Sequence, residues 1–160
     1  KKEDVYYPGF RTESLELIDK NLYNSLMRTI LLKCLDDSVG LYRSISSFNC
    51  IGRMHFHYIN SDSVVNDKWK HRDPTLMAGV VYLKKNPPPN TGTVLYIDGK
   101  ETVIENRYNR LVLYRSDILH KVQESFGKNI YDSRLTLTIF IDKITLDVYY
   151  DKDNILSNDA

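Results

Sequence analysis

The sequence predicts a mainly β protein, an antiparallel sandwich or jelly roll, with one helix near its N-terminal end. From residue 41 onward, short runs rich in Val, Ile, Tyr, Thr and Leu alternate with clusters of Asn, Asp, Gly and Pro. This texture is typical of short strands joined by turns. Before it, apolar residues recur at helical spacing. The 160 residues fit one domain, residues 1–160, that is large enough to bury a substantial core.

The lead-in to the strands, residues 14–37, combines two patterns. Ser14–Asp19 alternates apolar and polar residues, which predicts a brief strand. The apolar residues with helical spacing are Leu22, Tyr23, Leu26, Met27, Ile30, Leu31, Cys34 and Leu35. They predict an amphipathic helix that ends near Asp36, with Gly40 beyond its end. We expect this helix to pack on the protein's own sheet, and a helix that binds a partner is the alternative.

The β core is expected over about residues 41–150. Its predicted strands are Leu41–Ser46, Ile51–Ile59, Leu76–Lys84, Thr93–Ile97, Arg110–Tyr114, Arg134–Asp142 and Thr145–Tyr150. Asn86–Gly92 contains three consecutive prolines and is too short for a linker, so it predicts a rigid turn between two strands. The acidic tail, residues 151–160, is expected to be frayed.

Composition excludes or disfavours several classes of protein. Lys and Arg number 22 against 21 Asp and Glu, a net charge of +1, so bulk charge gives no support to a nucleic-acid partner. No apolar run approaches the roughly 20 residues that cross a bilayer, and the start of the chain lacks a signal-peptide core. Cys34 and Cys50 are too far apart for a zinc site or a disulfide framework and are expected to be buried apolar residues. We expect an intracellular protein without membrane contact.

Three polar residues form a candidate metal site. His71 and Asp73 are separated by one residue, so on an extended segment both side chains leave the same face and can share one ion. His120 is the best third ligand. Two histidines and one carboxylate form the facial triad of non-haem Fe(II) oxygenases, whereas zinc favours a closed tetrahedral set. A surface histidine beside a turn aspartate is the alternative. His55 and His57 share one face of a predicted strand, and a second metal site there is a weaker hypothesis.

A longer pattern surrounds these residues. In order along the chain it reads Trp69-Lys-His71-Arg-Asp73-Pro, Ala78-Gly-Val-Val-Tyr-Leu83, Thr91-Gly-Thr93, Asn109-Arg-Leu-Val-Leu113, His120 and Arg134-Leu-Thr-Leu-Thr138. This order resembles the prolyl-hydroxylase-like branch of the Fe(II)- and 2-oxoglutarate-dependent oxygenases. The resemblance covers about Tyr58 to Asp142. Two departures are a single glycine between Thr91 and Thr93 and a longer stretch between His120 and Arg134.

The resemblance implies both a fold and a set of site residues. It implies a double-stranded β-helix, a jelly roll with the N-terminal helix on its larger sheet. The implied metal ligands are His71, Asp73 and His120, and Arg134 is the implied anchor of 2-oxoglutarate, for which a planar and permanently charged guanidinium is well suited. Further implied co-substrate residues are Tyr82, Thr136, Thr138 and Tyr58, and candidate substrate-pocket residues are Trp69 and Phe140.

The strand that carries Arg134 has the alternation such a role requires. Thr136, Thr138 and Phe140 share the face of Arg134, and the intervening Leu135, Leu137 and Ile139 lie on the other face. This predicts a polar pocket on one side of the strand and an apolar core on the other.

By resemblance, the chain is expected to be a dioxygenase that uses Fe(II), 2-oxoglutarate and O2, with ascorbate as a candidate reductant and succinate and CO2 as co-products. Asp73 favours hydroxylation over halogenation, since the halogenases of this kind lack the carboxylate. The prime substrate is expected to be a peptide side chain, prolyl in type, or a small molecule. Two alternatives stay open: a jelly-roll binding module in which the triad is a coincidence, and a metal-binding relative without turnover.

Overall fold

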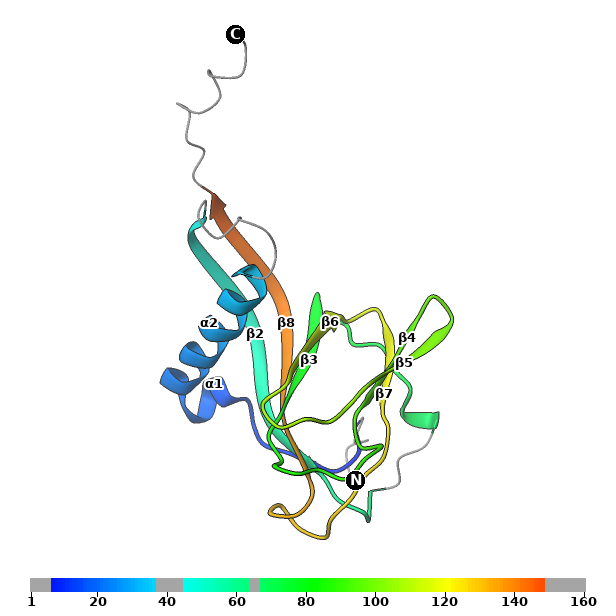
Figure 1. The fold of residues 1–160 in the computed structure, drawn as a ribbon. Coiled ribbons are helices and arrows are strands. Elements are labelled where there is room, and N and C mark those ends of the chain that lie inside the picture. The colour runs from blue at the N-terminus through cyan, green and yellow to red at the C-terminus, as the bar shows by residue number, and fades with distance from the viewer. Residues whose placement is uncertain (1–6, 37–44, 64–66, 149–160) are drawn as a thin grey trace, which may run out of the picture.

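The computed structural model describes residues 7–36, 45–63 and 67–148, which form two antiparallel sheets and few helices (Figure 1). In chain order the elements are β1 (Phe10–Arg11), α1 (Leu15–Ile18), α2 (Lys20–Asp36), β2 (Ile45–Ile59), the 3-10 helix η2 (Asp67–Trp69), β3 (Met77–Tyr82), β4 (Thr93–Ile97), β5 (Lys100–Ile104), β6 (Leu111–Arg115), β7 (Leu119–Val122) and β8 (Arg134–Val148). The mainly β prediction is therefore confirmed.

The two sheets differ in size and in what covers them. The larger sheet has the strand order β1-β2-β8-β3-β6 and the smaller sheet the order β5-β4-β7. In Figure 1 the helices α1 and α2 lie beside β2 and β8, on the side of the larger sheet that faces away from β4, β5 and β7. The expected position of the N-terminal helix, on the larger sheet, agrees with this arrangement.

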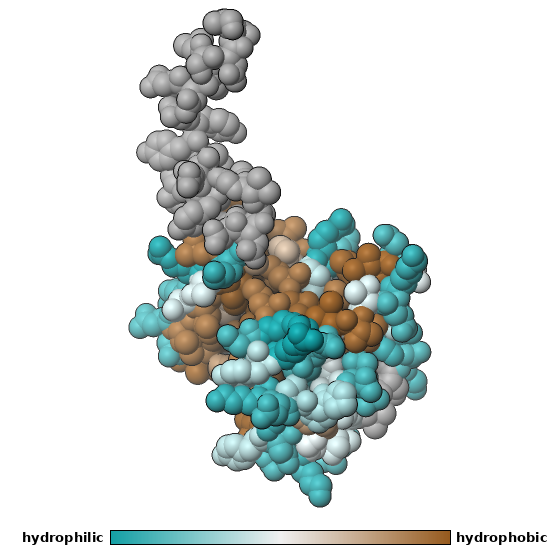
Figure 2. Space-filling model, in the orientation of Figure 1, coloured by the Kyte–Doolittle hydropathy of each residue, from teal (hydrophilic) through white to brown (hydrophobic). Residues whose placement is uncertain are grey.

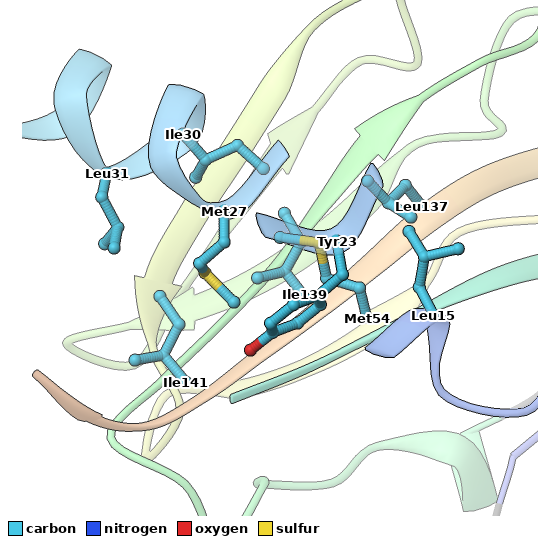
Figure 3. Close-up of a cluster of buried hydrophobic side chains, with 9 residues drawn as sticks. All are labelled: Leu15, Tyr23, Met27, Ile30, Leu31, Met54, Leu137, Ile139 and Ile141. Carbon is cyan, nitrogen blue, oxygen red and sulfur yellow. The ribbon is translucent and has the colours of Figure 1, made fainter. Parts of the chain in front are cut away.

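Helix α2 packs through one apolar stripe. Tyr23, Met27, Ile30 and Leu31 are all buried, and their spacing returns to the same face of the helix every turn. They form the main core together with Leu15 of α1, Met54 of β2 and Leu137, Ile139 and Ile141 of β8, as Figure 3 shows. The Tyr23 hydroxyl donates a hydrogen bond of 2.9 Å to the carbonyl of Gly52. This bond ties the helix to β2.

The predicted strand at Ser14–Asp19 is wrong. Leu15–Ile18 form the short helix α1, in which the amide of Asp19 donates to the carbonyl of Leu15. In a strand Leu15 and Leu17 would share one face, but Leu15 is buried and Leu17 is 78% exposed. Only one of the two leucines reaches the core, so the alternation over these residues had no structural meaning.

Of the strands predicted from residue 41 onward, Thr93–Ile97 has the predicted bounds, as β4, and the others have different bounds within the described residues. Two predicted runs join in β8, which continues without a break to Val148, and Ile51–Ile59 is part of the longer β2. Positions 41–44 and 149–150 lie outside the described residues. Three described strands, β1, β5 and β7, were not predicted. The turn Asp98-Gly99, in which both residues have positive φ, is the hairpin signal that would have indicated β5.

The two faces of the larger sheet are chemically different. On β8, Leu137, Ile139 and Ile141 belong to the core under the helices. Arg134 and Thr138 instead line a cavity on the opposite face, between the sheets. A smaller apolar cluster of Ala78, Leu95 and Tyr114 joins the sheets beside that cavity. The polar and apolar faces expected for this strand are therefore present.

The helix leaves part of the sheet's outer face uncovered. Figure 2 shows a hydrophobic area that crosses the middle of this face of the molecule, with hydrophilic residues around it. A groove of about 710 Å³ runs between α2 and strands β3, β6 and β8, and its apolar lining includes Leu22, Leu26, Val81, Leu83 and Leu111. Cys34 and Cys50 are half-buried, not fully buried as expected, and pack at the edge of the main core. No described helix is long and apolar enough to span a bilayer.

The core under the helices yields a stability prediction. Ile139 is fully buried, so Ile139→Ala should lower the free energy of unfolding by about 2–5 kcal/mol through lost burial and a residual cavity. Urea unfolding followed by circular dichroism measures the change. Leu17→Ala is the control, because that side chain is 78% exposed and its loss should cost less than about 0.5 kcal/mol. Equal losses in the two variants would contradict the packing described.

Candidate metal centre and its cavity

The segment that carries His71 and Asp73 crosses from the smaller sheet to the larger one. The amide of His71 donates to the carbonyl of His120, and the amide of His120 donates to the carbonyl of His71, both at 3.0 Å. Two residues later the amide of Asp73 donates to the carbonyl of Ser116, also at 3.0 Å. Backbone pairing alone therefore brings His120 opposite His71 and sets Asp73 between them.

The three side chains converge on one point. Asp73 Oδ1 lies 3.6 Å from His71 Nε2, and Asp73 Oδ2 lies 3.4 Å from His120 Nε2. One ligand atom from each residue lies within 4.8 Å of the other two. Among the described residues this is the one cluster of at least three histidine, cysteine or carboxylate side chains that could hold a metal ion.

Hydrogen bonds fix both imidazoles in the form that a metal requires. His71 Nδ1 lies 2.8 Å from the carbonyl oxygen of Trp69, and His120 Nδ1 lies 2.9 Å from that of Ile118. A carbonyl only accepts, so each Nδ1 carries the hydrogen and each Nε2 presents a lone pair to the cluster. Hydrogen bonds of this kind orient metal-binding histidines. Two lone pairs and a carboxylate face one another, an arrangement that a cation between them would stabilise.

The ligand set fits iron better than a closed zinc site. It offers three protein ligands, two nitrogens and one carboxylate, which leaves further positions of an octahedral ion open. The His120 and Asp73 side chains are 8% and 13% exposed, whereas that of His71 is 44% exposed. The cluster is therefore enclosed on the His120 side and open on the His71 side, from which other molecules can approach.

Behind the cluster lies a cavity of about 70 Å³ between the two sheets. Residues from both sheets line it, including His71, Asp73, His120, Thr93, Val122, Tyr114, Arg134, Thr138 and Phe140. The three candidate ligands and Arg134 thus border one cavity. A ligand in this space could contact both.

Arg134 is a buried cation without an acidic partner. It is 1% exposed, and its guanidinium donates to the carbonyl of Thr91 at 2.9 Å and to the hydroxyl of Thr93 at 3.3 Å. No Asp or Glu oxygen in the described ranges lies within 4.0 Å of it. Burial lowers the pKa of Arg134, and the neighbouring Tyr82 opposes that shift. A buried charge of this kind normally has a counter-ion, so the site favours an anionic ligand.

Tyr82 and Thr93 support Arg134 from the side. The Arg134 guanidinium carbon lies 5.3 Å from the centre of the Tyr82 ring, close enough for a cation–π contact. The Tyr82 hydroxyl lies 2.8 Å from that of Thr93, so Thr93 contacts both residues. Sequence analysis selected Tyr82 but gave Thr93 no role. Its place in the Thr91-Gly-Thr93 motif was the available signal.

The remaining predicted pocket residues divide into two groups. Phe140 and Thr138 line the cavity. Thr136 shares their face, but it is fully buried and its hydroxyl donates to the carbonyl of His57 at 3.3 Å. Trp69 does not line the cavity, and its carbonyl instead accepts the bond that orients His71. The expected place of Trp69 in a substrate pocket stays a prediction.

The structure places Tyr58 on the wrong side of β2 for the expected contact with a co-substrate. Its ring stacks on Phe10 with 4.9 Å between the ring centres. Along the same strand His57 lines the cavity, and successive strand residues point to opposite faces, so Tyr58 points away from it. The expectation rested on position along the chain and ignored this alternation.

The sequence matches no protein-family model, and no curated protein is significantly similar to it. Among solved structures, a prolyl-4-hydroxylase from Pseudomonas putida aligns with 77% of this chain and 63% of its own length, at 19% identity and a TM-score of 0.48. A bsmA homologue from Methylobium petroleophilum aligns with 57% of this chain and 41% of its own length, at 16% identity and a TM-score of 0.42. The chain thus spans less than two thirds of either structure. Similarities this distant do not assign a family, so a function must be inferred from the residues of the site.

Two histidines of β2 hold the N-terminal segment against the cavity. His57 Nε2 donates to the carbonyl of Pro8 at 2.6 Å, and His55 Nδ1 donates to that of Thr12 at 3.0 Å. Each bond uses one ring nitrogen of its histidine, and among the described residues neither histidine belongs to a cluster of three or more potential metal ligands. The two bonds also position Arg11, a cavity residue that sequence analysis missed because no motif contains it.

Burial of His57 makes a pH prediction. Burial lowers its pKa to about 3, mainly by desolvation, with Arg11 adding repulsion. Between about pH 6.5 and 3 only the unfolded chain protonates this residue, so unfolding becomes easier as the pH falls, by up to about 1.4 kcal/mol per pH unit. Above about pH 6.5 the residue is neutral in both states and has no such effect.

His57→Gln should remove this contribution and can still donate to the Pro8 carbonyl. When the pH falls from 6.5 to 5, the parent should therefore lose up to about 2 kcal/mol of unfolding free energy relative to the variant. Urea unfolding with a chelator present measures it. Parallel pH curves for the two proteins would show that His57 is not buried in its neutral form.

Proposed function

We propose that this chain is an Fe(II)- and 2-oxoglutarate-dependent oxygenase that hydroxylates its substrate. The observation that carries the proposal is the pairing, on one cavity, of a His-Asp-His cluster with a buried and unpaired arginine. An oxo acid with a second carboxylate is a co-substrate that can bind a metal at the cluster and pair with the arginine at the same time. Its oxo-acid end can chelate a metal, and its far carboxylate can pair with a guanidinium.

We also interpret the two sheets as a jelly roll of the double-stranded β-helix type. Neighbouring strands come from distant parts of the chain, β2 beside β8 and β4 beside β7. The backbone pairing of His71 with His120 adds a further short segment to the edge of the smaller sheet. A jelly roll of this type would explain the position of the candidate metal ligands, which lie where the two sheets meet.

In the proposed reaction the side chains bind and orient. His71, Asp73 and His120 would hold the metal, and their carbonyl-bonded Nδ1 atoms keep both Nε2 lone pairs directed at it. Arg134 would hold the far carboxylate of 2-oxoglutarate, with the Thr93 hydroxyl fixing the guanidinium. The apolar residues between the sheets limit access of water, which strengthens that ion pair.

Bound iron would supply the oxidation: O2 converts 2-oxoglutarate to succinate and CO2, and its second oxygen atom enters the prime substrate as a hydroxyl group. Ascorbate is a candidate for keeping the metal reduced between turnovers. A peptide side chain of prolyl type or a small molecule is the proposed prime substrate.

His71→Ala tests the metal site. It removes one of three ligands, and since changes to mere partners of ligands already cost about 10–100-fold in affinity, metal binding should weaken at least 100-fold. The variant should fold, because this side chain is 44% exposed. Anaerobic titration with Fe(II) and 2-oxoglutarate should give a visible charge-transfer band in the parent protein and none in His71→Ala.

His55→Ala is the matched control, since its Nδ1 is engaged by the carbonyl of Thr12 and it lies outside the cluster. It should keep the band. No band in the parent protein, or a full band in His71→Ala, would refute the oxygenase. A band without release of succinate and CO2 would identify a metal-binding relative without turnover.

Arg134→Gln tests the co-substrate anchor. Loss of a charge-assisted hydrogen bond is worth about 1.5–3 kcal/mol, so 2-oxoglutarate should bind about 10–100-fold more weakly while metal binding is kept. Calorimetric titration of the metal-loaded protein measures both. The sharper comparison uses 2-oxobutyrate, which chelates a metal in the same way but lacks the far carboxylate.

The affinity for 2-oxobutyrate should therefore be nearly the same in the parent protein and in Arg134→Gln. Arg28→Gln, an exposed arginine of α2, should change neither affinity. Equal weakening of the two oxo acids, or loss of the metal together with the co-substrate, would mean that Arg134 maintains the fold and does not contact the carboxylate.

A further inference from the structure

A second, larger hollow opens from the metal cluster toward solvent. Its volume is about 530 Å³, and its lining shares Tyr7, Arg11, His71, Asp73 and Phe140 with the inner cavity. It also reaches Arg53, His55, Arg72, Pro74 and Thr75. We call these residues the outer groove. Its size is in the range of pockets that bind small organic molecules or a few residues of a peptide.

The outer groove is strongly basic in a protein that is nearly neutral overall. Three arginines line it, Arg11, Arg53 and Arg72, and Asp73 is the one acidic residue among the lining residues of the described chain. Asp73 faces the two histidines of the metal cluster. In contrast to the net charge of +1 over 160 residues, this surface would attract anions.

Arg11 is the one arginine of the groove that also lines the inner cavity. Pairing of β1 with β2 sets Arg11 opposite His57. Its guanidinium carbon lies 3.9 Å from the centre of the Tyr7 ring and 5.3 Å from that of Phe140. Two aromatic rings thus hold the cation in place and leave its edge for hydrogen bonding.

One donor of this guanidinium has no partner among the described residues. Arg11 Nε is buried with no hydrogen-bond acceptor, and in the described part of the chain no carboxylate lies within 4.0 Å of the side chain. Buried donors normally have an acceptor, and an unpaired one costs free energy. An oxyanion in the groove would supply the missing acceptor.

The other two arginines extend the same surface outward. The guanidinium carbon of Arg53 lies 5.9 Å from the centre of the Phe140 ring. Two guanidinium groups, that of Arg11 on β1 and that of Arg53 on β2, therefore lie near this ring. Arg53 pairs at 3.4 Å with Asp142, and both side chains are exposed. A bound carboxylate could replace so weak a pair. Arg72 donates through Nε to the carbonyl of Asp117, which fixes it at the groove.

We propose that the outer groove binds the prime substrate through a carboxylate, with Arg11 as its direct partner and Arg53 and Arg72 as secondary contacts. The inference rests on the proposed function for the identity of the ligand as a substrate. Because Arg11 and the metal ligands border the same opening, the carbon that is oxidised lies close to that carboxylate. An acidic residue of a polypeptide and a free small carboxylic acid both carry this chemistry.

Binding of matched probes tests the groove. The probes are two capped pentapeptides that differ only in a central glutamate or glutamine, together with N-acetylglutamate as a free acid. Each is titrated calorimetrically, without oxygen, into protein saturated with Fe(II) and 2-oxoglutarate. The glutamate peptide or N-acetylglutamate should bind at least about 10-fold more tightly than the glutamine peptide, and added salt should reduce the preference.

Arg11→Gln should reduce this preference for the acid about 10-fold, and Arg11→Lys should restore part of it. Arg53→Gln should have a smaller effect, and Arg28→Gln on the exposed surface of α2 should have none. Arg53→Gln and Arg28→Gln should keep the affinity for 2-oxoglutarate, which separates the groove from the Arg134 site. Tight binding of N-acetylglutamate indicates a free acid, and binding of the peptide alone indicates a polypeptide.

The proposal is overturned if the glutamate and glutamine peptides bind equally, if Arg11→Gln weakens both to the same extent, or if neither acidic probe binds at millimolar concentration. The same titrations without metal separate this result from failure of the proposed function. If the protein does not bind Fe(II) but still prefers the acidic probes, the oxygenase is refuted and the groove remains an anion-binding site.

Discussion

The long antiparallel pairing of β2 with β8 is the interaction on which the rest of the molecule depends. It runs from Ile45 opposite Val148 to Ile59 opposite Arg134. Because side chains alternate across both strands, one face of this ladder supplies the apolar residues that bury α2, and the other supplies the polar residues of the cavity. A slip of one residue would put Arg134 under the helix and Leu135 in the cavity. The core therefore fixes the register that the site requires.

Sequence patterns anticipated what local periodicity encodes. The helical spacing over residues 22–35 and the alternation from Arg134 to Phe140 both describe real faces, since burial of one face is itself the cause of the pattern. The strand proposed for Ser14–Asp19 failed because six residues are too few to separate alternation from a single helical turn. Strand β5 escaped notice since its sequence, Lys-Glu-Thr-Val-Ile, is largely exposed.

The sequence predicted those parts of the site whose residues lie close together along the chain. His71 and Asp73 lie two residues apart, so geometry on an extended segment already joins them. His120 joins them through a backbone pairing between distant segments, and the sequence offered it only as the best remaining histidine and through the resemblance. Arg11 and the carbonyl of Trp69 reach the site through tertiary contacts that no spacing rule could have identified, whereas Thr93 lies in a motif that the sequence shows. Tyr58 shows the converse, a residue at the expected position whose side chain points to the other face.

The charges around the cavity suggest why metal and anion should bind together. Two imidazole lone pairs and the Asp73 carboxylate converge at one place, and the buried guanidinium of Arg134 lies on the same cavity. Each arrangement is costly when unpaired in surroundings of low dielectric constant. A cation relieves the first cost and an anion the second. A molecule that chelates the cation and carries a carboxylate at its far end relieves both costs. The protein already bears the repulsion among the metal ligands and the desolvation of Arg134, so their relief adds to the binding free energy of that molecule. The proposed preference for such a molecule would then follow from the fold, which holds both groups in place before any ligand arrives.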